Sequence, residues 1–369
     1  MPISRALLVA PLVLCLLALG STSLPSEPHL TPASSYLPRL VVEGRAPAAA
    51  FLARHNTPGH SGLYDSEGTG IRVADRFRAG SITKSFVATV VLQLAAEGAL
   101  RLDDSVEEHL PGVVRGHGNS GALITLRALL THTSGLYDYT AALPAADPAL
   151  TGVAGPSAQP LSPAAAVRTA VAHPPAAARG SYAYSSTNYV LLGMVVQRVT
   201  GHTYGTEIRR RIIVPLRLTG TSLPGARTTL PLPHSRAYHR AGDGTLRDVT
   251  SLDPRVGGAA GELVSTLDDL DHFYAALLGG RLLAPAQLSA LLDTRAAGGS
   301  YGMGIHSQKL SCGTTVWGHR GRITGSYVRS AATRDGRHVF TFRVNTDTPP
   351  ARSLETALLE AEFCARRLF

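Results

Sequence analysis

Strand-like segments lie near both ends of this chain, and helix-like segments fill its middle. Residues 47–55 and 62–68 are typical of two strands joined by the turn-rich sequence NTPGHS. Further strands are predicted between residues 301 and 346, and a last helix runs from Ser353 towards Phe369. We therefore predict an α+β fold whose antiparallel sheet is built from both chain ends and flanked by helices.

The middle of the chain is predicted to form an inserted all-helical subdomain, at approximately residues 105–255. Its expected helices have apolar residues at helical spacing and recognisable ends. They cover residues 123–135, 162–174, 187–201 and 206–218. We predict one large domain over residues 46–369, preceded by a Pro- and Ser-rich leader or linker over residues 24–45.

The N-terminus has the pattern of a secretory signal peptide. Arg5 precedes an apolar stretch from Ala6 to Leu19, and small residues follow it. That stretch is short for a permanent membrane anchor. We predict a signal peptide over residues 1–23 and secretion to the cell-wall side, with an uncleaved anchor as the alternative.

The net charge of +9 comes mainly from arginine. No segment interleaves basic and aromatic residues as a stacking platform for nucleic acid would require, so no nucleic-acid partner is expected. Anionic polymers of the cell surface suit an exported basic protein better. Codon bias is an equally good explanation of the arginines.

Ser81 and Lys84 are the first candidates for catalysis. Lys84 is one of only two lysines, the other being Lys309. Residues three apart on a helix share a face, so the amine can reach the hydroxyl. A partly buried lysine can take the proton of a serine nucleophile, and helix N-terminal N–H groups can stabilise an oxyanion. Alone, this spacing also fits a solvated lysine.

Four sequence blocks in a fixed order make the catalytic interpretation much more specific. They cover residues 80–104, 124–139, 182–201 and 316–328. Together they resemble the serine penicillin-recognising hydrolases of the D-alanyl-D-alanine carboxypeptidase and class C β-lactamase type, from about Ala48 to the C-terminus. The resemblance implies a β-lactamase/transpeptidase-like fold and catalysis through an acyl-enzyme.

The resemblance assigns roles to residues of the first two motifs. Its Ser-x-x-Lys motif falls on Ser81 and Lys84, and its Tyr-x-Asn motif on Tyr184 and Ser186. Tyr184 would relay the serine proton, with Lys84 lowering the pKa of the phenol. Ser186 replaces the family asparagine and offers fewer hydrogen-bond donors, which puts substrate choice in doubt, although Asn188 could compensate.

The third motif falls on His319, Arg320 and Gly321. His319 would position substrate, and Gly321 would let the substrate backbone approach closely. The backbone N–H groups of Arg322 and Ser81 would form the oxyanion hole. Either Arg320 or Arg322 could hold a substrate carboxylate, unless both point to solvent.

Cys312 and Cys364 are the two cysteines that remain once a signal peptide containing Cys15 is removed. An even pair in an oxidising compartment predicts a disulfide that fastens the C-terminal helix to a late strand. Two unpaired small hydrophobes are the alternative. The position of Cys312 also matches a disulfide of secreted carboxypeptidases of this type.

Competing motifs are weaker. Ser300 lies in a Gly-x-Ser-x-Gly sequence, but a helix precedes it and a strand follows, which reverses the order that a nucleophile elbow needs. The histidines show no metal-binding spacing, and His132 is expected to support a turn. We therefore expect no metal and no cofactor.

The expected activity is that of a D-alanyl-D-alanine carboxypeptidase that acts on peptidoglycan stem peptides, as a monomer. β-Lactams would be covalent inhibitors. The alternatives are an esterase or β-lactamase on the same scaffold, and a non-catalytic wall-binding relative.

Overall fold

A computed structural model describes residues 32–43, 45–55, 62–143 and 161–365. The predicted signal peptide, residues 1–23, lies outside these residues. In the described part of the chain, no helix has the length and apolar character needed to cross a membrane.

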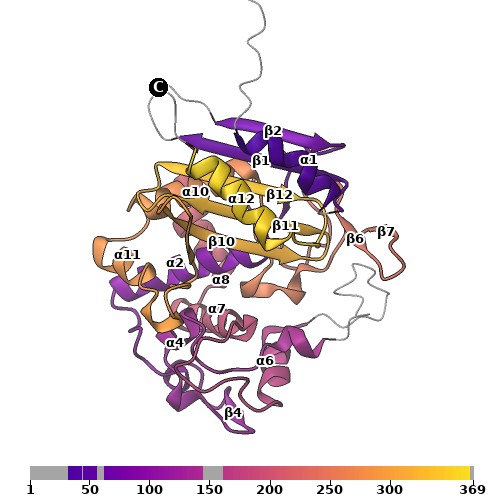
Figure 1. Ribbon diagram of the computed structural model, residues 1–369. Coiled ribbons are helices and arrows are strands. Elements are labelled where there is room, and N and C mark those ends of the chain that lie inside the picture. Colours follow the sequence, from indigo (N-terminus) through magenta and orange to yellow (C-terminus); the bar gives the residue numbers. More distant parts are fainter. Residues whose placement is uncertain (1–31, 44, 56–61, 144–160, 366–369) are drawn as a thin grey trace, which may run out of the picture.

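One antiparallel sheet, built from both ends of the chain, is the centre of the fold (Figure 1). Its strand order is β2-β1-β12-β11-β10-β9. These strands are β1 (Ala48–His55), β2 (Leu63–Gly68), β9 (His306–Lys309), β10 (Thr315–Ile323), β11 (Ser326–Ala332) and β12 (His338–Val344). The predicted fold class is therefore confirmed, because β1 pairs directly with the last strand, β12.

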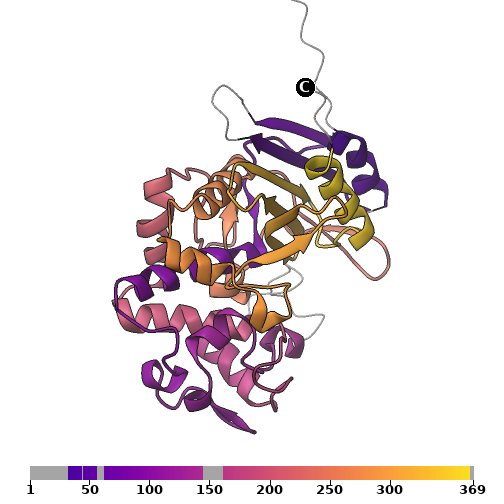
Figure 2. The same cartoon turned by 60° about the vertical axis from the view of Figure 1, so that its left-hand side comes forward.

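The sheet is covered on both faces because successive side chains of a strand point to opposite sides. In β1, Phe51 packs into one apolar cluster and Leu52 into the other. α1 (Leu37–Val42) and α12 (Arg352–Phe363) lie side by side over the first face (Figures 1 and 2). α10 (Leu267–Leu278) packs against the second face.

Part of the segment expected to be a leader or linker is helical. Residues 32–36 form a single 3₁₀ turn and α1 follows directly. Leu37 and Leu40, three residues apart, are both buried in the cluster under α12. Burial of that apolar stripe explains why this stretch is ordered against the sheet.

The helical lobe lies beyond the second face of the sheet and is organised around α7 (Ser186–Thr200) (Figure 1). α7 contacts α2 (Thr83–Ala96), α4 (Leu126–Leu130) and α6 (Pro163–Val171). Other helices among the described residues are α3 (Val106–His109), α8 (Tyr204–Ile208), α9 (Val214–Leu216) and α11 (Pro285–Leu291). Three short two-stranded ladders among the described residues were not predicted from the sequence.

They are β3 (Phe77–Arg78) with β8 (Val264–Ser265), β4 (Arg115–Gly116) with β5 (Asn119–Ser120), and β6 (Tyr238–Arg240) with β7 (Leu246–Asp248).

Helix α4 is shorter than predicted. It was expected to continue to Gly135 but ends at Leu130. His132 has a φ of 57°, in the left-handed region that ends a helix. The N–H of Thr133 returns to the carbonyl of Ala128 at 2.9 Å, which closes the last turn.

Cys312 and Cys364 form the disulfide that the sequence predicts, with Cα atoms 5.7 Å apart. Cys312 lies in the turn between β9 and β10, and Cys364 directly follows α12. The bond therefore ties the end of the C-terminal helix to the strands next to the site described below.

Candidate active site

Ser81 lies in a 3₁₀ turn, Gly80–Ile82, that connects β3 to α2. Two hydrogen bonds through the hydroxyl of Thr83 hold this turn. The hydroxyl donates to the carbonyl of Gly80 at 2.6 Å and accepts from the N–H of Leu263 at 3.0 Å. The first turn of α2 is thereby fastened to the segment that precedes β8, and Ser81 faces Lys84 one turn further along.

Lys84 is completely buried, and its amine has three oxygen neighbours. Nζ donates to Ser81 Oγ at 3.0 Å and to the Ala260 carbonyl at 2.8 Å, and it lies 3.5 Å from Ser186 Oγ. Burial lowers the pKa of Lys84 from 10.5 to about 7, against a smaller opposite effect of Asp138. Near neutral pH, a large fraction of this amine is therefore unprotonated and able to accept the proton of Ser81.

Tyr184 completes the group around the nucleophile. Its ring centroid lies 4.9 Å from Lys84 Nζ, in the range of a cation–π contact. Burial raises the pKa of Tyr184, and a hydrogen bond with Ser81 opposes that rise. The pKa of this phenol is therefore raised, whereas the sequence led us to expect that Lys84 would lower it; 37% of the residue is nevertheless exposed. A phenol that keeps its proton can donate it to a leaving group, while Lys84 acts as the base.

His319 lies on β10 and reaches the same group. Its ring centroid is 6.4 Å from that of Tyr184, and its Nε2 lies 3.1 Å from the hydroxyl of Tyr301. Nδ1 lies 2.5 Å from the carbonyl of Arg320, which fixes the ring orientation. Burial, with the nearby His306 and Lys84, lowers the pKa of His319 well below its usual value. His319 is therefore neutral at physiological pH and can act as a hydrogen-bonding group.

Gly321 lies against the turn that carries Ser81. A Cβ atom at this position would overlap the carbonyl oxygen of Ala79, so the residue makes room for the turn that carries Ser81. Gly80 has a φ of +50°, and a Cβ there would lie 2.7 Å from the backbone N of Arg322. The backbones of β10 and the Ser81 turn therefore touch without intervening side chains.

The two arginines of this strand differ in their surroundings. Arg320 does not join the site, because its Nε forms an ion pair with Glu355 of α12 at 2.6 Å. It also donates to Gln308 Oε1 at 3.3 Å. The alternation of side chains explains this placement, since His319 and its neighbour must point to opposite faces of the sheet. The side chain of Arg322 is exposed, and this residue remains a candidate for carboxylate binding.

Ser186 and Asp138 form a second wall of the site. Ser186 begins α7, and its N–H donates to Asp138 Oδ2 at 3.1 Å. Asp138 also caps the turn Tyr139–Ala142 by accepting from the N–H of Thr140 at 3.0 Å. Sequence reasoning missed Asp138, although it belongs to one of the four blocks and lies next to a tyrosine-rich turn.

His132 supports the segment that carries Tyr184. Its carbonyl accepts from the N–H of Ala183 at 2.8 Å, and its Nδ1 accepts from the N–H of Ser185 at 3.2 Å and lies 3.0 Å from Asn188 Nδ2. The expectation that His132 supports a turn was therefore too narrow. Asn188, which we considered as a replacement for the missing motif asparagine, instead donates to this ring.

Ser300, the competing nucleophile, has a structural hydrogen bond. Its hydroxyl donates to the carbonyl of Ala297 at 3.0 Å. The surrounding chain runs from the turn Arg295–Ala297 to β9, without the strand-to-helix geometry of a nucleophile elbow.

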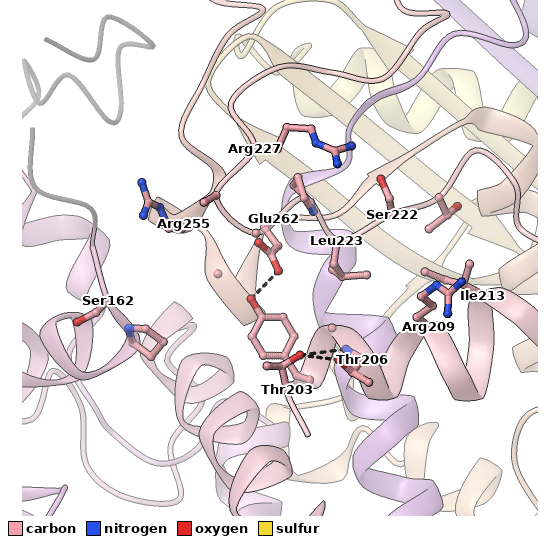
Figure 3. A pocket seen from close by; sticks show the side chains of 18 of the residues that line it. Ser162, Thr203, Thr206, Arg209, Ile213, Ser222, Leu223, Arg227, Arg255 and Glu262 are labelled. Atoms are coloured by element: carbon pink, nitrogen blue, oxygen red, sulfur yellow. Dashed lines mark hydrogen bonds between the residues drawn. The ribbon is translucent and has the colours of Figure 1, made fainter. Parts of the chain in front are cut away.

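A separate cavity of about 740 Å³ lies between α8 and the segments around residues 221–227 and 255–262 (Figure 3). Glu262 accepts a hydrogen bond of 2.6 Å from Tyr204 on its wall, and Arg209, Arg227 and Arg255 surround the opening. Glu262 is two residues from Ala260, the carbonyl partner of Lys84.

The comparisons with known proteins agree with this geometry. Residues 36–364 match the family model described as Beta-lactamase.

The chain belongs to the beta-lactamase family.

A solved structure similar to this beta-lactamase family member is the D-stereospecific amidohydrolase from Streptomyces sp. It is 42% identical, with a TM-score of 0.81, over 90% of this chain and 98% of that chain. The D-amino acid amidase from Ochrobactrum anthropi SV3, solved with D-phenylalanine, is 25% identical with a TM-score of 0.76, over 89% and 97% of the two chains. Penicillin-binding protein 4 of Amycolatopsis lactamdurans is 28% identical over 71% of each chain. The fold and the serine hydrolase family are thus established.

Proposed function

We propose that this beta-lactamase family member is a serine amidohydrolase that forms an acyl-enzyme on Ser81 and cleaves amide bonds of D-amino acid derivatives. The observation that carries the mechanism is the 3.0 Å hydrogen bond between Ser81 Oγ and the fully buried Lys84 amine. The D-configuration of the substrate is supported by the similarity to the D-stereospecific amidohydrolase, at 42% identity over nearly the whole of both chains.

The proposed acylation step uses the groups described above. Neutral Lys84 accepts the proton of Ser81 as the hydroxyl oxygen bonds to the carbonyl carbon of the substrate. The oxyanion receives hydrogen bonds from the backbone N–H groups of Ser81 and Arg322. Tyr184 donates its proton to the leaving nitrogen as the C–N bond breaks, and Lys84 returns a proton to the phenol. Water then hydrolyses the ester by the reverse proton path and releases the acid.

Two kinds of leaving group fit this proposal. A D-alanyl-D-alanine carboxypeptidase releases an amino acid whose carboxylate needs a cation, and the exposed Arg322 is the candidate for that contact. A D-amino acid amidase releases ammonia and needs no such contact. The ion pair of Arg320 with Glu355 removes one of the two predicted carboxylate ligands, which favours testing the amidase activity alongside the carboxypeptidase activity.

A substrate panel with intact-protein mass spectrometry tests the proposal. The panel contains acyl-D-Ala-D-Ala, D-phenylalanine amide, their L-counterparts, a nitrophenyl ester, a cephalosporin and a fluorescent penicillin. We expect turnover of a D-configured amide or peptide, covalent labelling by the penicillin, and loss of both in Ser81→Ala.

The control is Ser300→Ala, which should keep labelling and turnover because its hydroxyl donates within its own turn. Preferential turnover of the ester or the cephalosporin would replace the proposal with the esterase or β-lactamase alternative. If none of the donors forms an acyl-enzyme, the result would favour a non-catalytic wall-binding role.

We further propose that the protein is exported and acts as a monomer. Expression of the full chain in its native form should place it outside the cytoplasm, with residues 1–23 removed. Sizing by light scattering should give the mass of one chain. A retained N-terminus in the cytoplasmic fraction would contradict export, and a larger mass would contradict the monomer.

A further inference from the structure

Two histidines and a glutamate from three different elements meet at one end of the sheet, on the face that α12 covers. His55 is the last residue of β1, His338 is the first residue of β12, and the two are directly paired across the strands. Glu362 lies in the last turn of α12. One ligand atom from each of the three side chains lies within 4.8 Å of the others.

The ligand atoms of the three side chains are arranged around one common point. His338 Nε2 is 2.7 Å from Glu362 Oε1, and His55 Nε2 is 3.8 Å from the same oxygen. The two imidazole rings are 3.8 Å apart between centroids. Tetrahedral bonds of about 2.1 Å place ligand atoms roughly 3.4 Å from one another, so small side-chain rotations suffice to receive an ion.

Burial and charge favour a cation at this point. Only 4% of the Glu362 side chain is exposed, and the partners described for it are the two imidazoles. A largely covered carboxylate is stabilised by positive charge close to it, which a bound cation supplies. The neighbouring cation Arg54 points to the opposite face of the sheet, where it forms an ion pair with Asp268.

Neighbouring structure holds the three side chains in position. His338 packs against Phe363, with ring centroids 4.4 Å apart. The disulfide at Cys364, two residues after Glu362, fixes the same end of α12. The strand pairing of His55 with His338 fixes the other two ligands. Preorganised ligands lose little conformational freedom when an ion binds.

We propose that His55, His338 and Glu362 bind a divalent transition-metal ion, with zinc as the fitting representative. Two imidazoles and one carboxylate are ligands that zinc prefers, and water completes the coordination through the partly exposed side of the cluster. The ion fastens the end of α12 to the β1–β12 edge. Its role is structural, because the cluster lies on the face of the sheet opposite to the lobe that carries Tyr184.

The test measures zinc binding to the full, tag-free chain after removal of metals. Competition with a chromophoric chelator should show one zinc ion per chain, and zinc should raise the temperature of unfolding. His338→Gln and Glu362→Gln should each weaken binding by more than the roughly 10–100-fold loss that follows removal of a hydrogen-bond partner of a ligand. Both variants should keep penicillin labelling, which also shows that they fold.

A matched control separates this site from ordinary histidine–carboxylate pairs. His109 Nε2 lies 3.0 Å from Asp104 Oδ2, and both side chains are largely covered. This pair has one imidazole and one carboxylate, whereas the proposed site has a second imidazole. His109→Gln should bind zinc as the parent does. Absence of stoichiometric zinc, or equal affinity in the parent, His338→Gln and Glu362→Gln, would overturn the proposal. Since Ser81→Ala leaves the cluster intact, its zinc binding separates failure of this site from failure of the proposed catalysis.

Discussion

Replacement of Lys84 by methionine should abolish a pH dependence of stability that wild type has. Burial lowers the pKa of Lys84 from 10.5 to about 7. At about 1.4 kcal/mol per pH unit, this difference amounts to about 5 kcal/mol between the two pKa values. Methionine has a similar length and no proton to bind, so it removes this contribution while still filling the buried space.

The sign follows from proton binding. Between pH 7 and 10.5 the unfolded chain holds a proton on Lys84 that the folded chain lacks, so the free energy of unfolding rises with pH. We expect the difference between wild type and Lys84→Met to grow by about 1.4 kcal/mol per pH unit across this window. Below pH 7 both states are protonated, and the difference should become constant.

Urea unfolding at a series of pH values measures this difference, with the fluorescence of the single tryptophan, Trp317, as the probe. Trp317 is 7% exposed in β10 and should report loss of the sheet. Lys309→Met removes the other lysine, which is exposed at the end of β9, and serves as the control. Parallel pH profiles for wild type and Lys84→Met would refute the idea that burial holds the pKa of this amine near 7.

Three further predictions concern activity and stability. The rate constant kcat/KM should fall about tenfold per pH unit below pH 7, because protonated Lys84 cannot accept the serine proton; a flat profile from pH 5 to 8 would contradict this. Gly321→Ala should lower the rate of acylation by at least about 100-fold, because the added Cβ overlaps the carbonyl oxygen of Ala79 in the turn that carries the nucleophile. The rate of labelling by penicillin measures this effect. An unchanged rate would mean that the turn can shift freely. Joint replacement of Cys312 and Cys364 by serine should lower the free energy of unfolding by about 4 kcal/mol, because the disulfide closes a loop with a sequence separation of 52 residues. Urea titration of the two proteins measures this difference. A loss below about 1 kcal/mol would show that the closed loop constrains the unfolded chain little.

The sequence was most informative where a pattern is local. The two strand-like stretches at residues 47–55 and 62–68, with a turn-rich sequence between them, predicted the N-terminal hairpin, and the structure confirms that the two strands pair. The Ser81–Lys84 spacing predicted a contact that depends on only one helical turn. Disulfide pairing required only a count of cysteines and a compartment.

Sequence reasoning failed where the answer depends on distant partners. The role of Asp138 depends on the N–H of Ser186, which lies 48 residues away. The helix end at Leu130 depends on the left-handed His132, whose ring accepts a hydrogen bond from Ser185. The packing of other segments around Tyr184 raises its pKa, although 37% of the residue is exposed. The direction of Arg320 is the exception, since alternation from His319 could have predicted it.

The contact between Gly80 and β10 has a consequence for how enzymes with this site can diversify. Main-chain atoms of two segments meet beside the nucleophile, and Gly321 keeps that boundary free of side chains. Changes at the exposed side chain of Arg322 can therefore alter which acyl donor is accepted without displacing the reactive oxygen, whereas Ser186 also lies 3.5 Å from the Lys84 amine. Reactivity and selectivity are thus separable at Arg322, and directed evolution for new amides should start from that position.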